Sequence, residues 1–360
     1  MSAAAERVER LRAASAEAGF DAYLATSDES IAYLTGFKPL QMERFFGVVV
    51  RADGAGVIVP KLDAGQLNGA PETLERVSYD AASDGMPELA GLLDGAKSVG
   101  VEEDHLNFAR SRALEGRGIE PVAAGSLLMA LRAEKDESEV EAVRRACALV
   151  EEAYAFAFDQ LVPGTVEREL NSRVASFLRD RGATDSHPLI LFGENAANPH
   201  AEPTERRLRV GDVVCADISA CLDGYWGDLT RCATSGAPTE WARRAWDIVV
   251  SAQRAAIDAC VVGVPARDVD RAAREIVEAH PELGQCLHGA GHAVGLALHE
   301  PPYLVPRTET LLRPGMIFTV EPGIYDARHG GIRLEDDVVV RDGAPEILST
   351  LPLDLVELPV

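Results

Sequence analysis

One sequence pattern occurs twice in this chain and constrains its fold more than any other feature. Its first copy, residues 208–231, reads LRVGDVVCADISACLDGYWGDLTR. The largely apolar residues 213–218 are typical of a buried strand, Asp223-Gly224 favours a tight turn, and residues 227–232 can return as the partner strand. Asp217 and Asp228 then come from neighbouring strands. Because two carboxylates in an apolar strand pair repel each other and cost free energy to desolvate, we expect a positive group between them.

The second copy lies about a hundred residues later, in LLRPGMIFTVEPGIYDARHGGIRLEDDVVV at residues 311–340. Its LRPG aligns with the LRVG of the first copy at an offset of 104, which places Glu321 on Asp217. The second turn is longer, so Glu335 corresponds to Asp228. Four carboxylates that converge on one point predict a site for two divalent cations with oxygen ligands and room for a nitrogen ligand.

The candidate nitrogen ligands lie between the two copies, in CLHGAGHAVGLALHEPP at residues 286–302. This segment contains His288, His292 and His299, and we expect its glycines to let the backbone approach a ligand closely. It fits neither GxGxxG nor GxxxxGK, which excludes a phosphate loop. A single Asp in a strand, or a single His, is more often structural than functional. Five such residues at matched spacing in a repeated frame favour a metal site.

Composition bounds the class of protein and its partners. At 360 residues the chain is long enough for two domains with their own cores, and its 47% hydrophobic and 26% charged residues are typical of a globular protein. With 35 basic against 58 acidic residues the formal charge is −23, which argues against nucleic acid or an anionic membrane as a partner. The acid-rich composition is compatible with salt adaptation or with a GC-rich genome.

The sequence also indicates a cellular location. The N-terminal stretch MSAAAERVERLRAA is charged and amphipathic without the apolar core of a signal peptide, and no run of 18 apolar residues follows it. The six cysteines form neither a CxxC pair nor a paired framework. Reduced thiols in a cytoplasmic protein are therefore expected.

The first part of the chain alternates between helical and strand patterns. Residues 4–18 have helical periodicity, residues 20–26 read as a strand, and residues 46–51 with 56–59 read as a hairpin. Residues 98–102 are a further short strand. This alternation predicts an α/β domain over residues 1–130, without catalytic groups and with His105 on its surface.

The remainder, residues 131–360, is expected to be a second domain with an internal duplication. Asp136 caps a long helix, a break at 162–165 follows, and a second helix runs to Arg181. The same order recurs with a helix over 246–260, a break at 262–265 and a helix to about residue 280. Because each helix pair precedes an acidic hairpin, we predict two halves of an α+β domain around a pseudo-twofold axis, with the metal site between them. Residues 187–203 form a loop that can lean over the site, with His187 in a structural role.

The motifs D-x10-D, HGAGHAVGLALHEPP, TVEPGIY and IRLEDDVVV together resemble those of the pita-bread metallopeptidases, specifically the Xaa-Pro peptidase branch of prolidases and Xaa-Pro aminopeptidases. The segment FDAYLATSDESIAYLTGF resembles the start of the creatinase-type N-terminal domain that precedes many of them. The resemblance covers nearly the whole chain. The sequence departs from the family at Ser219, Gly227 and Ala293, where Gly, Ser and Gly are common, but no departure removes a ligand.

The resemblance implies that two divalent ions are bound by five side chains: Asp217, Asp228, His292, Glu321 and Glu335. Hard oxygen ligands with one imidazole suit Mn²⁺, and also Co²⁺, Fe²⁺ or Zn²⁺. Two such ions can share a water and lower its pKa.

The resemblance also implies roles for residues around the metal ions. Glu321 would carry the proton of the attacking water to the leaving nitrogen, and His299 and His200 would bind the scissile carbonyl. His288 would line the pocket for the residue after the scissile bond. Arg333 matches an arginine that either faces the substrate or pairs with the acidic cluster, and the sequence leaves these two interpretations open.

The implied reaction is hydrolysis of the Xaa-Pro bond in a dipeptide or short peptide with Pro at the second position, by a homodimer. The compact length and short N-terminal domain favour an Xaa-Pro dipeptidase over an Xaa-Pro aminopeptidase. One alternative is a hydrolase of the same fold that acts on a small amide or amidine. Another is a metal-free binding or scaffold protein, against which the complete ligand set argues, since such a protein would be free to lose a ligand.

Overall fold

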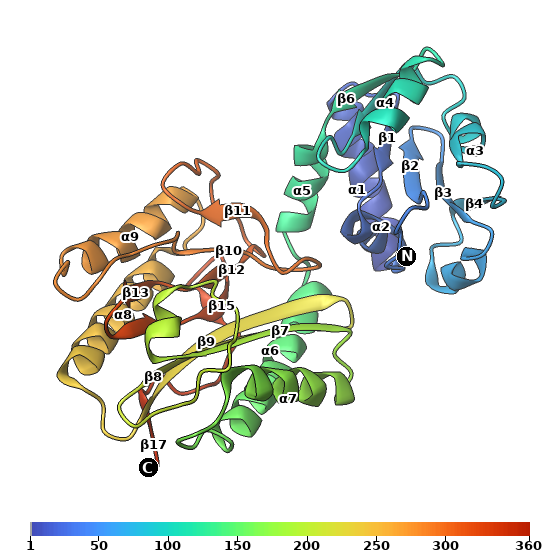
Figure 1. Ribbon diagram of the computed structural model, residues 1–360. Helices are drawn as coiled ribbons and strands as arrows, with labels where there is room; N and C mark the ends of the chain where they lie inside the picture. The colour runs from blue at the N-terminus through green and yellow to red at the C-terminus, as the bar shows by residue number, and fades with distance from the viewer. Residues whose placement is uncertain (1) are drawn as a thin grey trace. The chain divides into compact units, whose positions relative to one another are not determined.

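The computed structural model describes residues 2–360, which form two compact units, one ending at Arg132 and the other beginning at Ala133. The N-terminal unit is built on a six-stranded mixed sheet in the order β4-β3-β2-β1-β5-β6 (Figure 1). Its strands are β1 Ala22–Ala25, β2 Gly47–Arg51, β3 Ala55–Pro60, β4 Leu74–Tyr79, β5 Ser98–Val101 and β6 Glu120–Ala123. Its helices are α1 Ala3–Glu17, α2 Asp28–Thr35, the 3-10 helix Ala64–Gly69, α3 Met86–Leu92, α4 Phe108–Glu115 and α5 Gly125–Ala133.

The expected elements of this unit are confirmed. The helix expected over residues 4–18 is α1, which begins where the Ser2 side chain accepts a hydrogen bond from the Ala5 amide and buries Val8 and Leu11. The expected hairpin is the antiparallel pair of β2 and β3. His105 is exposed, as expected, with its Nδ1 3.1 Å from the Thr26 hydroxyl. Helices with a mixed, partly parallel sheet give the predicted α/β class.

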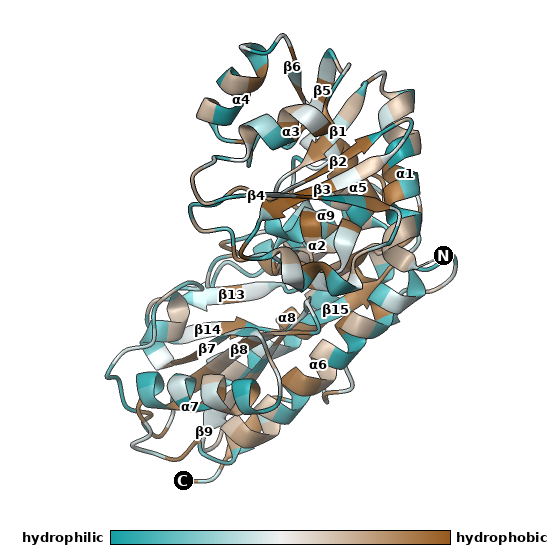
Figure 2. Cartoon of the chain, turned by 90° about the vertical axis from the view of Figure 1, so that its right-hand side faces the viewer, coloured by the Kyte–Doolittle hydropathy of each residue, from teal (hydrophilic) through white to brown (hydrophobic). Residues whose placement is uncertain are grey.

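The second unit contains two pairs of long helices, as the repeated pattern predicts: α6 Glu137–Phe158 with α7 Glu167–Asp180, and α8 Glu240–Ala259 with α9 Ala266–Glu278. Helix α6 begins after Asp136 in a complete capping box, in which Asp136 and Glu139 each accept a hydrogen bond from the other's backbone. The sequence pattern places the start of helix α8 at Trp246. The helix begins six residues earlier, because the Thr239 side chain caps it there. Figure 2 shows α6 with both apolar and polar residues along its length, the former facing the core.

The first acidic repeat forms the predicted hairpin. Strands β8 Val213–Leu222 and β9 Tyr225–Ser235 pair in an antiparallel ladder and are joined by Asp223-Gly224, both with positive φ (52° and 86°). With β7 Asp185–Phe192 and β17 Val356–Leu358 they form a sheet in the order β17-β9-β8-β7. Because side chains alternate between the faces of a strand, Val214 and Ala216 pack with α6 and α7, and Asp217 faces away from those helices.

The second acidic repeat pairs in the same way but is interrupted. Strand β12 Ile317–Val320 pairs with β15 Asp336–Val339, and between them β13 Gly323–Asp326 and β14 Gly330–Arg333 form a separate two-stranded ladder. The break follows Glu321, where Pro322 lacks the backbone N–H that a continuous ladder needs. Strands β10 Gly291–Ala293, β11 Glu300–Leu304 and β16 Glu346–Ile347 complete a five-stranded sheet, β11-β10-β12-β15-β16.

The two halves of this unit meet at their acidic strands. Thr230 of β9 forms a backbone bridge with Glu335, directly before β15. Buried Arg231 crosses the same junction, where it donates to the carbonyl of Glu335 at 2.7 Å and to the carboxylate of Asp336 at 2.7 Å. The predicted duplication, with a helix pair and an acidic strand pair in each half, is confirmed. The junction between the halves holds the strand ends that carry the acidic residues.

Two glycines allow close packing of protein backbone. A Cβ at Gly291 would lie 2.0 Å from the carbonyl oxygen of Thr319 on β12, and Gly291 has a φ of 153°. A Cβ at Gly227 would lie 2.5 Å from the backbone nitrogen of Cys147 on α6. Gly289 and Gly291 also line a cavity of about 190 Å³, so the expectation that the glycines of the 286–302 segment let the backbone approach a ligand stays a prediction. The departure from Ser at Gly227 fits the close crossing of α6 over β9.

Within residues 2–360, no helix is long enough and apolar enough to cross a bilayer.

Candidate metal centre and active site

The first two acidic residues lie on one face of the β8–β9 hairpin. Asp217 of β8 is opposite Thr230, and Asp228 of β9 is opposite Ser219. Residues that face each other across an antiparallel pair point to the same side of the sheet. The two carboxylates are therefore diagonal neighbours on the face turned away from α6 and α7.

The other three candidate ligands reach the same point from the second half. Glu321 directly follows β12, Glu335 directly precedes β15, and His292 lies in β10, which pairs with β12. His292 Nε2 is 3.6 Å from Glu321 Oε1 and 3.8 Å from Asp228 Oδ2. Potential ligand atoms of Asp228, His292 and Glu335 all lie within 4.8 Å of one another. All five candidate ligands line one cavity of about 190 Å³.

The electrostatics of this cluster fit a bound cation. Burial, together with repulsion from Asp217, raises the pKa of Asp228 well above its usual range, and burial with repulsion from Asp228 does the same for Glu335. Burial raises the pKa of Glu321 to about 7. Burial lowers the pKa of His292 to about 3, so its imidazole is neutral and keeps a lone pair.

The orientation of the side chains supports the same interpretation. His292 Nδ1 lies 3.1 Å from the carbonyl oxygen of Ala293, which leaves Nε2 directed at the carboxylates. Asp228 Oδ1 is buried and, among the described residues, has no hydrogen-bond partner. Buried carboxylate oxygens without donors, next to a neutral imidazole, form a donor set suited to hard divalent ions.

Arg333 of β14 compensates part of the negative charge. Its Nη2 donates to Asp217 Oδ2 at 2.6 Å, and its Nε donates to the hydroxyl of Thr230 at 3.1 Å. Thr230 in turn donates to Glu335 Oε2 at 2.6 Å. The side chain of Arg333 is only 5% exposed. Of the two interpretations that the sequence left open, this geometry favours pairing with the acidic cluster over direct contact with a substrate.

His288 belongs to a hydrogen-bonded chain that includes Tyr325, a residue to which the sequence gave no role. Arg333 Nη1 donates to the Tyr325 hydroxyl at 2.9 Å, the hydroxyl lies 2.7 Å from His288 Nε2, and His288 Nδ1 lies 2.8 Å from the carbonyl oxygen of Gly289. Burial lowers the pKa of His288 to about 4, so the ring is neutral. The arrangement is satisfied when Tyr325 donates to Nε2 and Nδ1–H donates to Gly289. His288 therefore lines the cavity with both nitrogens already engaged.

The other two predicted histidines differ from His288 because they are exposed. His299 and His200 line both the 190 Å³ cavity and a second, adjoining cavity of about 450 Å³. The ring of His299 lies 3.8 Å, centroid to centroid, from that of His292. His200 comes from the segment between β7 and β8. Both are placed to meet a molecule that enters beside the metal ligands.

The structure adds residues that sequence reasoning missed. Asp337, two positions after Glu335 on the same face of β15, accepts hydrogen bonds from the amide of Asp228 at 3.1 Å and from the thiol of Cys147 at 3.2 Å. The alternation in LEDDVVV contained the signal, since residues two apart share a face. His187, expected to be structural, lines the second cavity. The full lining of that cavity is His187, Leu189, His200, Glu202, Asp217, Ser219, Asp228, Leu298 and His299.

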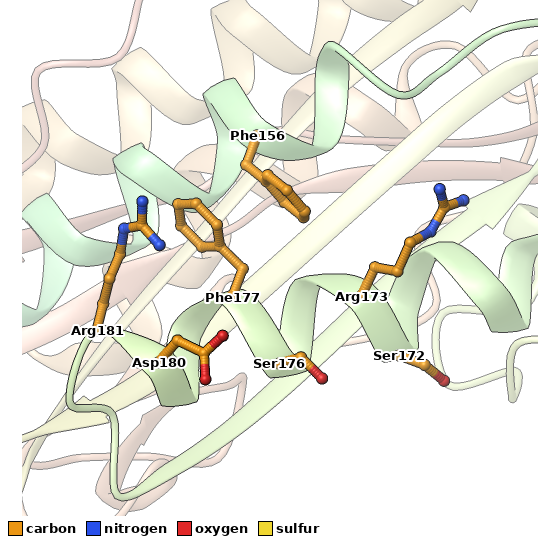
Figure 3. Close-up of a pocket in the computed structure, with 7 residues that line it drawn as sticks. All are labelled: Phe156, Ser172, Arg173, Ser176, Phe177, Asp180 and Arg181. Carbon is orange, nitrogen blue, oxygen red and sulfur yellow. The ribbon is translucent and has the colours of Figure 1, made fainter.

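A further pocket, between α6 and α7, has a different character (Figure 3). Phe156 and Phe177 stack at 4.4 Å, and the guanidinium of Arg181 covers the other ring face of Phe177 at 3.6 Å. Its lining residues are Phe156, Ser172, Arg173, Ser176, Phe177, Asp180 and Arg181. It has no cluster of metal-ligating side chains, so the chemistry of the described residues concentrates at the junction of the two halves.

The raised pKa values predict how metal-free protein responds to pH. A carboxyl group whose folded-state pKa is raised binds more protons in the folded state than in the unfolded state, so stability falls as pH rises from about 4 to that raised pKa. Glu321 and Asp337, with pKa values raised by burial to about 7, place this loss between about pH 4 and pH 7. Protein treated with a chelator should melt several degrees lower at pH 8 than at pH 5.5.

The control for this measurement is the metal-loaded protein. A bound cation offsets the negative charge of the carboxylates that protons neutralise at lower pH. The stabilisation by metal should therefore grow as pH rises over the same interval. Differential scanning calorimetry of both forms from pH 5 to pH 8 measures the difference. A gap between the two melting temperatures that narrows with rising pH would contradict the electrostatic account of the cluster.

Comparison with known proteins agrees with this geometry. Residues 141–342 match the model of metallopeptidase family M24, and residues 7–133 match that of the creatinase/prolidase N-terminal domain. A probable dipeptidase PepE from Mycobacterium tuberculosis is 32% identical over 363 aligned residues, which cover 99% of this chain and 97% of that protein.

Solved structures extend the similarity to the fold. An Xaa-Pro dipeptidase from Bacillus anthracis superposes with a TM-score of 0.91 at 30% identity, covering 99% of this chain and 100% of the other. A prolidase from Pyrococcus horikoshii superposes with a TM-score of 0.89 at 27% identity, covering 98% and 100%. The second unit has the pita-bread fold that the sequence motifs predicted. The chain thus belongs to metallopeptidase family M24 and joins its pita-bread catalytic domain to a creatinase/prolidase-type N-terminal domain.

Proposed function

We propose that this enzyme is an Xaa-Pro dipeptidase that uses two divalent metal ions to release proline from dipeptides. The observation that carries the proposal is the convergence of Asp217, Asp228, His292, Glu321 and Glu335 on one cavity, beside two exposed histidines. Support also comes from the similar proteins, which include an Xaa-Pro dipeptidase and a prolidase. In this proposal residues 1–130 form the creatinase-type domain and residues 131–360 carry out catalysis.

The proposed roles follow from the donor chemistry. When bound, the two ions supply Lewis acidity that activates water and polarises the scissile carbonyl. Glu321, with its pKa raised by burial to about 7, takes the proton of the attacking water and passes it to the leaving nitrogen. His299 and His200 donate hydrogen bonds to the carbonyl oxygen as it gains negative charge.

The smaller cavity is proposed to hold the proline. Its volume of about 190 Å³ is less than half that of the adjoining cavity of about 450 Å³, which suits one five-membered ring with its carboxyl group better than a longer peptide. Its walls include the neutral ring of His288 and the side chains of Tyr303, Val305 and Arg333. This small volume favours a dipeptidase over an aminopeptidase that accepts longer peptides.

The remaining assignments rest on the chemistry of the side chains and on the family resemblance. Carboxylate ligands with one imidazole favour Mn²⁺, with Co²⁺, Fe²⁺ or Zn²⁺ as alternatives. We propose a cytoplasmic location, because all six cysteines are free and five of them are buried. We also propose a homodimer, as the family resemblance implies, and analytical ultracentrifugation of the full chain tests it.

Selectivity for proline is the test of the proposed reaction. With Mn²⁺ added, kcat/KM for Ala-Pro should exceed that for Ala-Ala by ~10-fold or more, because a cavity shaped for an imino ring leaves an Ala side chain poorly packed. Ala-Pro-Ala, assayed in parallel, should be a poor substrate. Equal rates for Ala-Pro and Ala-Ala would refute the proline assignment, and faster cleavage of Ala-Pro-Ala would assign an aminopeptidase. No cleavage of any peptide would favour the amide or amidine hydrolase.

A further inference from the structure

Two adjoining cavities of different size meet at the candidate metal site. They share His200, Asp217, Asp228 and His299, so one bound molecule can occupy both while its reacting bond lies beside the metal ligands. One cavity has a volume of about 190 Å³ and the other about 450 Å³. In an Xaa-Pro dipeptide the second residue is fixed and the first varies. The fixed proline therefore fits the smaller cavity, and the variable residue fits the larger one.

The charged side chains that line the two cavities favour the same orientation of the dipeptide. None of the nine side chains that line the larger cavity is Lys or Arg, and three of them are carboxylates. The smaller cavity is lined by Arg333 and by the carboxylates of Asp217, Asp228, Glu321 and Glu335. In the proposed function two divalent ions offset these four negative charges, so Arg333 leaves the smaller cavity with a net positive charge. A dipeptide carries a cationic amino group on its first residue and an anionic carboxyl group on its second. Because unlike charges attract, the first residue favours the larger cavity.

We propose that the larger cavity is the subsite for the residue that precedes proline, and that Glu202 makes it selective for the cationic side chains of lysine and arginine. This inference rests on the proposed function and specifies its substrate class. Asp217 and Asp228 are committed to the metal ions in that function, which leaves Glu202 as the free carboxylate of the cavity. Within the described part of the chain no Lys or Arg forms an ion pair with Glu202.

The walls of the cavity match such a side chain. Leu189 of β7, which is buried, and Leu298, which is half-buried, supply aliphatic surface. Lys and Arg side chains pack their methylene stems on apolar surface while the charged head stays in a polar environment. Glu202 is exposed at the cavity, where a cationic head can reach it without complete loss of water.

The backbone on both sides of Glu202 is held by one buried carboxylate. Glu167 of α7 is fully buried and accepts hydrogen bonds from the Asn195 amide side chain at 2.8 Å and from the backbone nitrogen of Thr204 at 2.9 Å. The same Asn195 nitrogen donates to the backbone carbonyl of Glu202 at 3.3 Å. Glu202 thus extends from an anchored backbone segment, which reduces the conformational cost of placing its side chain beside a ligand.

The test compares kcat/KM for Lys-Pro and Met-Pro, whose first side chains are both unbranched and differ in charge. Glu-Pro is the third substrate. The proteins are the wild type, Glu202→Gln and the matched control Glu205→Gln. Glu205 lies three residues away, pairs with Arg168 and lines neither cavity, so its substitution removes the same net charge from the surface. The control separates a local contact from attraction by the overall charge of −23.

We expect the wild type to prefer Lys-Pro over Met-Pro and to cleave Glu-Pro slowest. Glu202→Gln should reduce the Lys-Pro to Met-Pro ratio by ~5- to 30-fold, as expected for loss of one charge a few ångströms away in partly screened surroundings. Glu205→Gln should keep the wild-type ratio. An unchanged ratio in Glu202→Gln, or an equal fall in both variants, would overturn the proposal for Glu202 while cleavage of Met-Pro still supports the peptidase. Absence of cleavage of all three dipeptides would instead overturn the proposed function, and this inference with it.

Discussion

Replacement of Glu321 by Gln is expected to abolish turnover, with kcat lower by a factor of ~10³ or more. The substitution keeps the shape of the side chain but removes a ligand charge and the group proposed to carry the proton, and a positioned acid or base alone contributes about 10²–10⁴-fold. Glu321 Oε1 lies 3.6 Å from His292 Nε2, within the cluster that would bind the metal ions.

Steady-state hydrolysis of Ala-Pro measures this effect. The matched control is Glu137→Gln, which removes a surface carboxylate that pairs with Arg341 on the same unit, and which should retain wild-type activity. Circular dichroism and metal content of both variants separate a loss of chemistry from a loss of fold. If Glu321→Gln kept a tenth or more of the wild-type kcat, Glu321 could not be the proton carrier.

Replacement of His299 by Ala is expected to lower kcat by ~10²–10³, the loss usual for one donor to a developing oxyanion. The side chain is exposed and lines both cavities, and its ring lies 3.8 Å from that of His292. We therefore expect it to contact the substrate rather than to hold the metal ions. Metal content should stay at the wild-type level.

His105→Ala in the N-terminal unit is the control for His299→Ala, since His105 is an exposed histidine outside both cavities. It should leave kcat unchanged. Elemental analysis accompanies the kinetics. Loss of metal from His299→Ala would show that His299 is a ligand rather than a residue that contacts the substrate.

Local sequence signals were sufficient to predict much of the fold. The apolar run at residues 213–218 and the Asp223-Gly224 turn correctly predicted one hairpin, and with it the neighbouring strands that carry Asp217 and Asp228. Asp136 and its capping box fixed the start of α6. These features depend on residues a few positions apart, so the sequence displays them directly.

Interactions between distant segments could not be predicted in the same way. The chain from Arg333 through Tyr325 to His288 joins β14, β13 and the segment before β10, and it forms only when the strands pair. The close approach of Gly291 to Thr319 likewise depends on the pairing of two strands that are distant in the sequence. Sequence alone therefore predicted a role for His288 in the pocket but not that both its nitrogens are engaged.

The central claim is that five side chains from two structural repeats hold two metal ions, and metal stoichiometry tests it most directly. Protein loaded with Mn²⁺ and desalted should contain close to two ions per chain by elemental analysis, and Asp228→Asn, which weakens a buried ligand, should contain fewer. Fully active protein that contains no metal would contradict the account.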